Sequence, residues 1–240
     1  MKTDYLHYYR RGHDDSPAHL ARMVRYFGGR LEPHLPADRQ ARILDVGCGL
    51  GFALEALRAR GYTRLEGIDT DPDQIAAAGA RGLAVAHVSD TAAWLRARPE
   101  QFHVVLLLDV LEHVPRAEQF DFLAAIHAAL VPRGRLICSV PNANSTLGSR
   151  QRYMDWTHHT SFTEHSLDFA LHHGGFAEIT VLADDGPRKP LPWLPLWRRR
   201  WWYVRGCLRA LRRLQLMAEL GPAEGRRSPL SPNLLGVAVK

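Results

Sequence analysis

Histidines, hydroxyl groups and a carboxylate are concentrated in one short stretch of the chain, residues 155–163, which reads DWTHHTSFT. An imidazole accepts a proton near neutral pH, and a carboxylate beside it can orient the ring. His158 is therefore a candidate general base with Asp155 as its orienting partner. The alternative role for both is to hold the loop by hydrogen bonds to the backbone. His113, after an earlier apolar run, is the competing base, and its alternative role is structural support.

A second set of residues suited to chemistry is the glycine-rich stretch ILDVGCGLG at 43–51. Three glycines let the backbone turn sharply and approach a ligand closely: Gly47, Gly49 and Gly51. A dinucleotide fingerprint needs its third glycine at position 52, where Phe52 stands, so pyrophosphate binding is disfavoured. Asp45 is expected either to face the ligand or to cap the amides of the turn.

Short apolar runs alternate with helix-compatible stretches, which are the elements that must position these residues. The runs lie at residues 42–46, 64–69, 83–88, 102–108 and 134–140. This alternation predicts βαβ units and a parallel, doubly wound sheet, with the almost wholly apolar run 102–108 as a central strand. A helix over 164–173, with Thr163 as N-cap, and strands over 176–182 and 234–239 complete the expected elements.

The order of the motifs over about residues 40–180 resembles the class I S-adenosylmethionine (SAM)-dependent methyltransferases, whose first strand ends in D/E-x-G-x-G-x-G. The stretches 66–69, 108–114 and 130–136 look like the family's later motifs, including an LEH signature after the fourth strand. The resemblance implies an α/β, Rossmann-like fold. Its sheet is expected to be mostly parallel and seven-stranded, with an antiparallel last strand.

The resemblance also implies SAM as cofactor and S-adenosylhomocysteine as product. Asp69 would accept hydrogen bonds from both ribose hydroxyls, since a carboxylate is acceptor-only and bidentate. Asp90 has an alternative role as a helix N-cap. The expected cofactor-binding residues are Asp45, Gly47, Gly49, Gly51, Asp69, Thr70, Ser89, Asp90 and Asp109.

The stretch at residues 155–163 also predicts the class of acceptor. A branch of this superfamily associated with bacterial glycan and lipopolysaccharide biosynthesis carries a pattern like D-x-T-H-x-R-x-F-T, although Thr160 replaces the usual Arg here. The matching residues are Asp155, Thr157, His158, Phe162 and Thr163. The resemblance implies a SAM-dependent O-methyltransferase acting on a sugar hydroxyl in surface-polysaccharide or related glycan biosynthesis, with a small-molecule or lipid-linked glycan acceptor. The alternatives are methylation of a quinone precursor or other small phenolic, and a non-catalytic SAM-binding scaffold.

Composition and cysteine usage limit the remaining possibilities. The 240 residues, 46% hydrophobic and 23% charged, suit a single globular domain over 1–240 with an N-terminal cap over 1–40. Three scattered cysteines predict neither a disulfide framework nor a zinc site, and the adjacent histidine pairs 158–159 and 172–173 lack chelating spacing, so no metal is expected. With neither a signal peptide nor a long apolar run in the sequence, a cytoplasmic location is expected.

The net charge of +6 comes from one segment, because residues 187–227 hold eleven Lys or Arg and two Glu. A basic insertion over 187–228 is expected, with a proline-rich linker over 187–195 followed by an amphipathic helix over 197–220. The apolar side of this helix is formed by Trp197, Trp201, Val204, Leu208, Leu211 and Ala218. The pattern predicts contact with the inner face of an anionic membrane. The alternative is packing on the sheet or on a second copy in a homo-oligomer, and nucleic acid is disfavoured.

Overall fold

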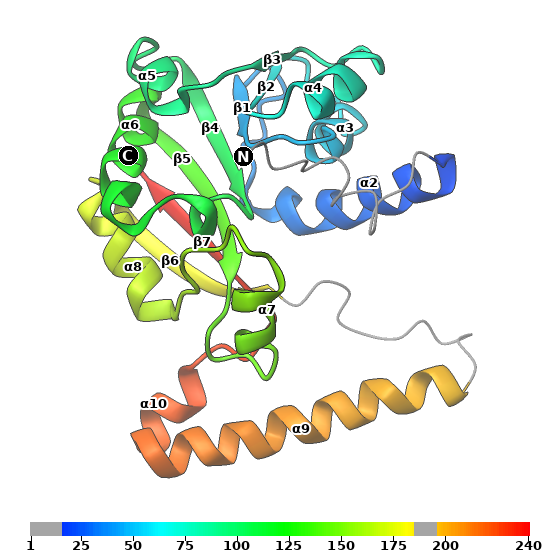
Figure 1. Ribbon diagram of the computed structural model, residues 1–240, viewed down its shortest axis with the longest axis vertical. Coiled ribbons are helices and arrows are strands. Elements are labelled where there is room, and N and C mark those ends of the chain that lie inside the picture. The colour runs from blue at the N-terminus through cyan, green and yellow to red at the C-terminus, as the bar shows by residue number, and fades with distance from the viewer. Residues whose placement is uncertain (1–15, 185–195) are drawn as a thin grey trace.

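A computed structural model of the chain describes residues 16–184 and 196–240, with side chains from residue 200 onward in the second range (Figure 1). The described strands form one sheet in the order β3-β2-β1-β4-β5-β7-β6. Their bounds are Ile43–Val46 (β1), Leu65–Asp69 (β2), Val85–His87 (β3), Phe102–Leu108 (β4), Leu130–Pro141 (β5), Ala177–Asp184 (β6) and Asn233–Val239 (β7). Only β7 runs antiparallel to its neighbours, so the predicted fold is confirmed.

Helices cover both faces of this sheet, with α2 and α3 on one face and α5, α6 and α8 on the other (Figure 1). The α-helices are Pro17–Leu31 (α2), Phe52–Arg58 (α3), Pro72–Gly79 (α4), Thr91–Arg96 (α5), Gln119–Ala129 (α6), Gly148–Met154 (α7), Glu164–His173 (α8), Leu196–Leu220 (α9) and Pro222–Arg227 (α10). Short 3-10 helices lie at Glu32–His34 (η1), Leu111–His113 (η2) and Arg116–Glu118 (η3).

The central strand β4 explains why the sheet needs two helical layers. Val104 and Leu106 pack with α2 and α3, whereas Val105 and Leu107 belong to the cluster under α5, α6 and α8. Successive side chains of a strand point to opposite faces, so a wholly apolar strand must be covered on both. The apolar run at residues 102–108 therefore predicted the position of β4 correctly.

Local signals placed α8 accurately and β5 less well. Thr163 caps α8 as predicted, since its Oγ1 accepts a hydrogen bond from the Ser166 amide at 3.2 Å. Strand β5 begins at Leu130, earlier than the predicted residue 134, because Leu130 pairs with Phe102 across a register shift in the ladder. Such a long-range pairing leaves no local pattern in the sequence.

The predicted terminal cap and basic insertion are only partly described. Residues 1–15 of the cap 1–40 and the linker 187–195 lie outside the described residues. Helix α2 lies within the predicted N-terminal cap, α9 matches the predicted basic helix, and α10 was not predicted. The division into cap, domain and insertion stays a prediction. None of the described helices combines the length and apolar character needed to cross a bilayer.

A buried ion pair joins α2 to the end of β6. The guanidinium of Arg30 contacts the carboxylate of Asp184, and both side chains are only 5% exposed. Arg30 also lies over the ring of Tyr26, with its Cζ 5.6 Å from the ring centroid. Because a lone buried charge is costly, this pair fixes the last turn of α2 against the carboxyl edge of the sheet.

Replacing Arg30 by Met is expected to lower the free energy of unfolding by about 3–5 kcal/mol, since it breaks the buried ion pair with Asp184. Urea unfolding followed by circular dichroism measures this loss. The matched control is Arg133→Met, which removes the exposed ion pair with Glu178 and is expected to leave stability unchanged. Equal losses in the two variants would contradict a structural role for the Arg30 pair.

Candidate active site

The loop after β1 forms the floor of the candidate site. The amides of Gly47 and Cys48 donate to the Ile68 carbonyl at 2.8 and 3.0 Å. Gly47 and Gly51 have φ values of 72° and 73°, which side chains other than glycine rarely adopt. A Cβ at Gly47 would also collide with Val110. The loop therefore requires its glycines both for backbone geometry and for space.

Asp69 links this loop to the end of β2. Its Oδ2 accepts the Gly49 amide at 2.8 Å and its Oδ1 accepts the Asp71 amide at 2.9 Å. Burial raises its pKa, and these amide hydrogen bonds oppose the rise. A carboxylate oxygen has more than one lone pair, so each oxygen can accept a further hydrogen bond from a ribose hydroxyl.

A buried acceptor without a partner lies beside the same loop. Oε1 of Gln74 has no hydrogen-bond partner among the described residues, and it would lie 2.8 Å from a Cβ built on Gly49. Orphaned buried polar atoms are uncommon and point to a ligand donor. The glycine loop, Asp69 and this amide together fit the adenosine and amino-acid portions of SAM.

Asp45 is buried in β1, and burial, followed by the charge of Asp69, raises its pKa to about 7. The amides of Gly47, Cys48 and Gly49 donate to other acceptors, so Asp45 does not cap these three amides of the turn. A carboxyl with this pKa would ionise on meeting a cation such as the ammonium group of SAM. Its cofactor-facing role stays a prediction.

The other expected cofactor residues follow β2 and β3 at the same edge. Asp90 caps α5, because its Oδ1 accepts the Ala93 amide at 2.9 Å, which matches its alternative role. Ser89 and Thr70 are exposed, and the Thr70 carbonyl lies 3.2 Å from Nε2 of His87. Cofactor contact by these residues is compatible with the geometry and stays a prediction.

Asp109 has a structural role that the sequence did not reveal. It stands at φ 56° after β4, and its amide donates to the Ser139 carbonyl at 3.0 Å. Its Oδ1 accepts hydrogen bonds from Ser139 Oγ and Asn233 Nδ2, both at 2.9 Å. Asp109 thus joins the ends of β4, β5 and β7, and its predicted contact with the cofactor would be additional to this role.

His113 is held by a chain of two hydrogen bonds. Its Nδ1 lies 2.8 Å from Thr157 Oγ1, and that hydroxyl donates to Asp155 Oδ1 at 2.6 Å. Because the hydroxyl proton is engaged by Asp155, we assign Nδ1–H of His113 as the donor to Thr157, which makes Nε2 the basic nitrogen. Burial tends to raise the pKa of the Asp155 carboxyl, but the hydrogen bonds from Thr157 outweigh burial and bring this pKa below its usual value.

His158 is oriented differently from the prediction. Its Nδ1 lies 2.8 Å from the Gln151 carbonyl and donates to it, and no hydrogen bond joins its ring to Asp155 among the described residues. The prediction that Asp155 orients His158 is therefore wrong, because Thr157 directs the carboxylate toward His113. The two rings pack edge to face with centroids 4.6 Å apart. Burial, followed by the neighbouring His158, lowers the pKa of His113 to about 4.

Glu112 completes a cluster that sequence spacing could not detect. It is buried, its Oε2 has no hydrogen-bond partner among the described residues, and burial raises its pKa well above the usual value. Potential ligand atoms of Glu112, His113 and His158 all lie within 4.8 Å of one another. The expectation of no metal rested on adjacent histidine pairs in the sequence, so it remains untested at this cluster.

Comparison with known proteins identifies relatives of this domain. A family model described as a methyltransferase domain matches residues 13–181. The ubiquinone biosynthesis O-methyltransferase of Cereibacter sphaeroides is 34% identical over 139 residues, which cover 55% of each chain. The protein of the same name from Pseudomonas syringae pv. tomato is 38% identical over 108 residues, covering 43% of this chain and 45% of that protein. The chain thus matches about half the length of these curated relatives.

Solved structures confirm the fold. A SAM-dependent methyltransferase from Archaeoglobus fulgidus superposes with a TM-score of 0.67 at 18% identity, covering 99% of this chain and 100% of the other. A possible histamine N-methyltransferase from Thermotoga maritima gives a TM-score of 0.64 at 16% identity, covering 98% and 96%. The family match confirms the prediction of a methyltransferase domain, and these structures confirm its fold.

The predicted sugar-hydroxyl acceptor is wrong. The curated relatives are named ubiquinone biosynthesis O-methyltransferases, which favours the alternative of a quinone precursor or small phenolic over surface-polysaccharide biosynthesis. The assignment to a glycan branch, and with it the lipid-linked glycan acceptor, lacks support. The pattern at residues 155–163 predicted a loop that carries histidines, but it did not predict which class of acceptor the loop serves.

Replacing Asp69 by Ala is expected to weaken S-adenosylhomocysteine binding by about tenfold to a hundredfold, because hydrogen bonds to a charged group contribute about 1.5–3 kcal/mol. Isothermal titration calorimetry measures the change. Asp73→Ala, an exposed carboxylate in the first turn of α4, is the matched control and should bind normally. Unchanged affinity in a folded Asp69→Ala protein would remove Asp69 from the binding site.

Proposed function

The chain belongs to the methyltransferase domain family, and on that basis we propose that it methylates a hydroxyl of a small phenolic acceptor, such as a quinone precursor. The observation that carries the proposal is the pair of oriented imidazoles, His113 and His158, with centroids 4.6 Å apart. They follow β4 and β5 at the edge where the glycine loop and Asp69 fit the cofactor. The relatives' names support the same class of acceptor.

The residues of the chain would supply alignment and proton transfer. Bound SAM provides an electrophilic methyl group, so the remaining task is to position the acceptor oxygen and remove its proton. His113, oriented through Thr157 and Asp155, would accept that proton on Nε2. His158, held by the Gln151 carbonyl, presents the second basic nitrogen of the same pair.

The low pKa of His113 favours a phenol over an aliphatic alcohol. With a pKa of about 4 the ring is neutral at physiological pH and is a weak base. A phenol, with a pKa of about 10, loses its proton far more readily than a sugar hydroxyl. Proton transfer to so weak a base is therefore less unfavourable for a phenolic acceptor.

Exposed aromatic side chains close in sequence to His158 suit an aromatic acceptor. Trp156 is 99% exposed and Tyr153 is 76% exposed, and both lie within a few residues of His158. Aromatic rings favour stacked or edge-to-face contact with another ring. A planar phenol with apolar substituents would cover part of this exposed surface. A homo-oligomer and the membrane contact predicted for residues 197–220 stay proposals.

An acceptor panel tests the proposed class. Simple phenols and catechols are expected to give kcat/KM values at least about tenfold above those of nucleotide sugars, because of their greater acidity and aromatic contacts. Transfer of a labelled methyl group from SAM measures the rates. Preference for the sugars would contradict the proposal. Tight S-adenosylhomocysteine binding with no turnover on any acceptor would instead support the non-catalytic scaffold.

The imidazole pair is tested by His113→Ala and His158→Ala, with exposed His159→Ala as the matched control. Loss of the base should lower kcat about a hundredfold or more, while SAM binding is retained. If His113 is the base, protonation of its ring occupies the nitrogen that must take the proton from the substrate. The kcat/KM of the native protein should therefore fall only as the pH approaches about 4. Full turnover in both variants at saturating SAM would exclude proton transfer by this pair.

A further inference from the structure

Helix α9 carries an exposed apolar stripe outside the matched domain. Trp201, Val204, Leu208 and Leu211 are 62%, 42%, 52% and 63% exposed. Their spacing of three, four and three residues places them on one side of the helix. Residues 13–181 carry the family match, so α9 is not part of the region shared with the family model.

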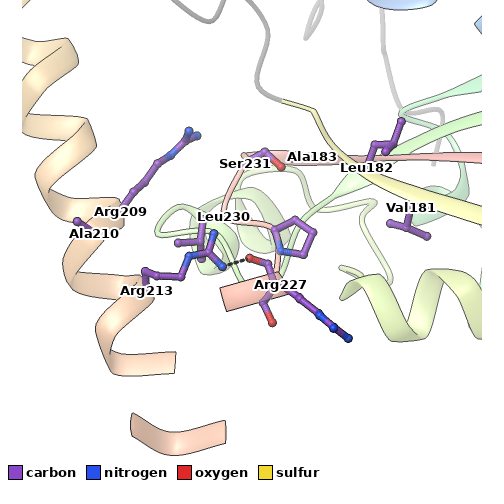
Figure 2. Close-up of a pocket in the computed structure, with 11 residues that line it drawn as sticks. Val181, Leu182, Ala183, Arg209, Ala210, Arg213, Arg227, Leu230 and Ser231 are labelled. Carbon is purple, nitrogen blue, oxygen red and sulfur yellow. Dashed lines mark hydrogen bonds between the residues drawn. The ribbon is translucent and has the colours of Figure 1, made fainter. Parts of the chain in front are cut away.

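The opposite side of α9 faces the rest of the protein. Arg209, Ala210 and Arg213 line a cavity whose other wall is formed by residues 181–183 and 228–231 (Figure 2). Arg213 donates to the Gly225 and Arg226 carbonyls at 2.8 and 2.9 Å and also to the Ser228 carbonyl. At about 100° per residue, these inward positions lie roughly opposite the apolar stripe.

Tight packing against α10 fixes this orientation. A Cβ on Gly225 would collide with the backbone of Met217, so the two helices cross at close range. Leu216, on the same side as the contact, is 7% exposed. In Figure 1, α9 lies apart from the sheet, to which α10 connects it. The apolar stripe therefore points away from the described part of the domain.

Basic side chains flank the stripe. Arg205 and Arg212, seven residues apart, lie along the neighbouring side of α9. Glu219 is the one acidic residue among residues 196–220, against seven arginines. An exposed apolar stripe beside a row of arginines is complementary to apolar acyl chains beneath anionic headgroups.

We propose that α9 lies in the interface of an anionic phospholipid bilayer and holds the methyltransferase domain at that surface. The apolar stripe would enter the acyl boundary, and the arginines would meet phosphate groups. The helix is too basic to cross the bilayer, which agrees with the absence of a spanning segment among the described helices. This proposal concerns α9 and is independent of the acceptor.

Co-sedimentation of the whole protein with vesicles tests the proposal. Vesicles of phosphatidylcholine mixed with phosphatidylglycerol are expected to bind the protein about tenfold more strongly than phosphatidylcholine alone, and added salt should weaken binding. The Leu208→Ser–Leu211→Ser double variant should lose binding to both kinds of vesicle. Arg205→Glu should reduce only the preference for the anionic vesicles.

Matched substitutions separate α9 from general effects of polarity and charge. Phe169→Ser changes another exposed apolar residue, on α8, and Arg64→Glu makes the same charge change beside the amino end of β2. Both should bind vesicles normally, and every variant should retain S-adenosylhomocysteine binding as a check of folding. Equal binding to the two vesicle types, or unchanged binding by the double variant, would overturn the proposal.

Sedimentation velocity without lipid tests the alternative that a second copy of the chain covers the apolar stripe. A monomer whose vesicle binding depends on Leu208 and Leu211 supports the membrane assignment. If the native protein is a dimer that the double variant converts to monomers, the stripe is an interface between two copies of the chain. That result would also overturn the proposal.

Discussion

The hydrogen bond from the Gly49 amide to the Asp69 carboxylate is the interaction on which the ligand edge depends. It fixes the loop after β1 against the end of β2, while the Gly47 and Cys48 amides are paired with the Ile68 carbonyl. The loop cannot move outward without leaving several amides unpaired, which is costly. Asp109 connects β4, β5 and β7 in a similar way. The carboxyl edge is thus ordered by the protein's own contacts.

The sequence predicted the elements well because their signals are local. Glycine spacing located the loop at 47–51, and the cap at Thr163 located the start of α8. The arrangement within the site was less accessible. The hydrogen bond between His113 and Thr157 joins residues 44 positions apart, so no short pattern could show that Asp155 is directed to His113 instead of His158. The roles of Gln74 and Glu112, and the structural role of Asp109, likewise became visible only through tertiary contacts.

The acceptor was mispredicted for a related reason. The pattern at residues 155–163 describes a loop that positions hydroxyl groups and imidazoles, and such a loop can serve several acceptors. In the proposed function, discrimination between a phenol and a sugar would depend on the basicity of the imidazole and on the surface around it. Burial lowers the pKa of His113, and the exposed Trp156 lies two residues from His158 in the sequence. Neither the basicity of the imidazole nor the surface around it can be predicted from residue spacing.

Helix α9 lies in the connection between β6 and β7, so it adds to the entropy cost of closing that connection. Strand β6 ends at Asp184 and β7 begins at Asn233, so a hairpin that could close through a few residues instead closes through residues 185–232. Closure entropy grows only with the logarithm of loop length, and a tenfold longer connection costs about 2 kcal/mol. Both strands are anchored in the sheet independently of what joins them. This connection is therefore a place where evolution, or an engineer, can exchange one appendage for another while leaving the glycine loop and the imidazole pair intact.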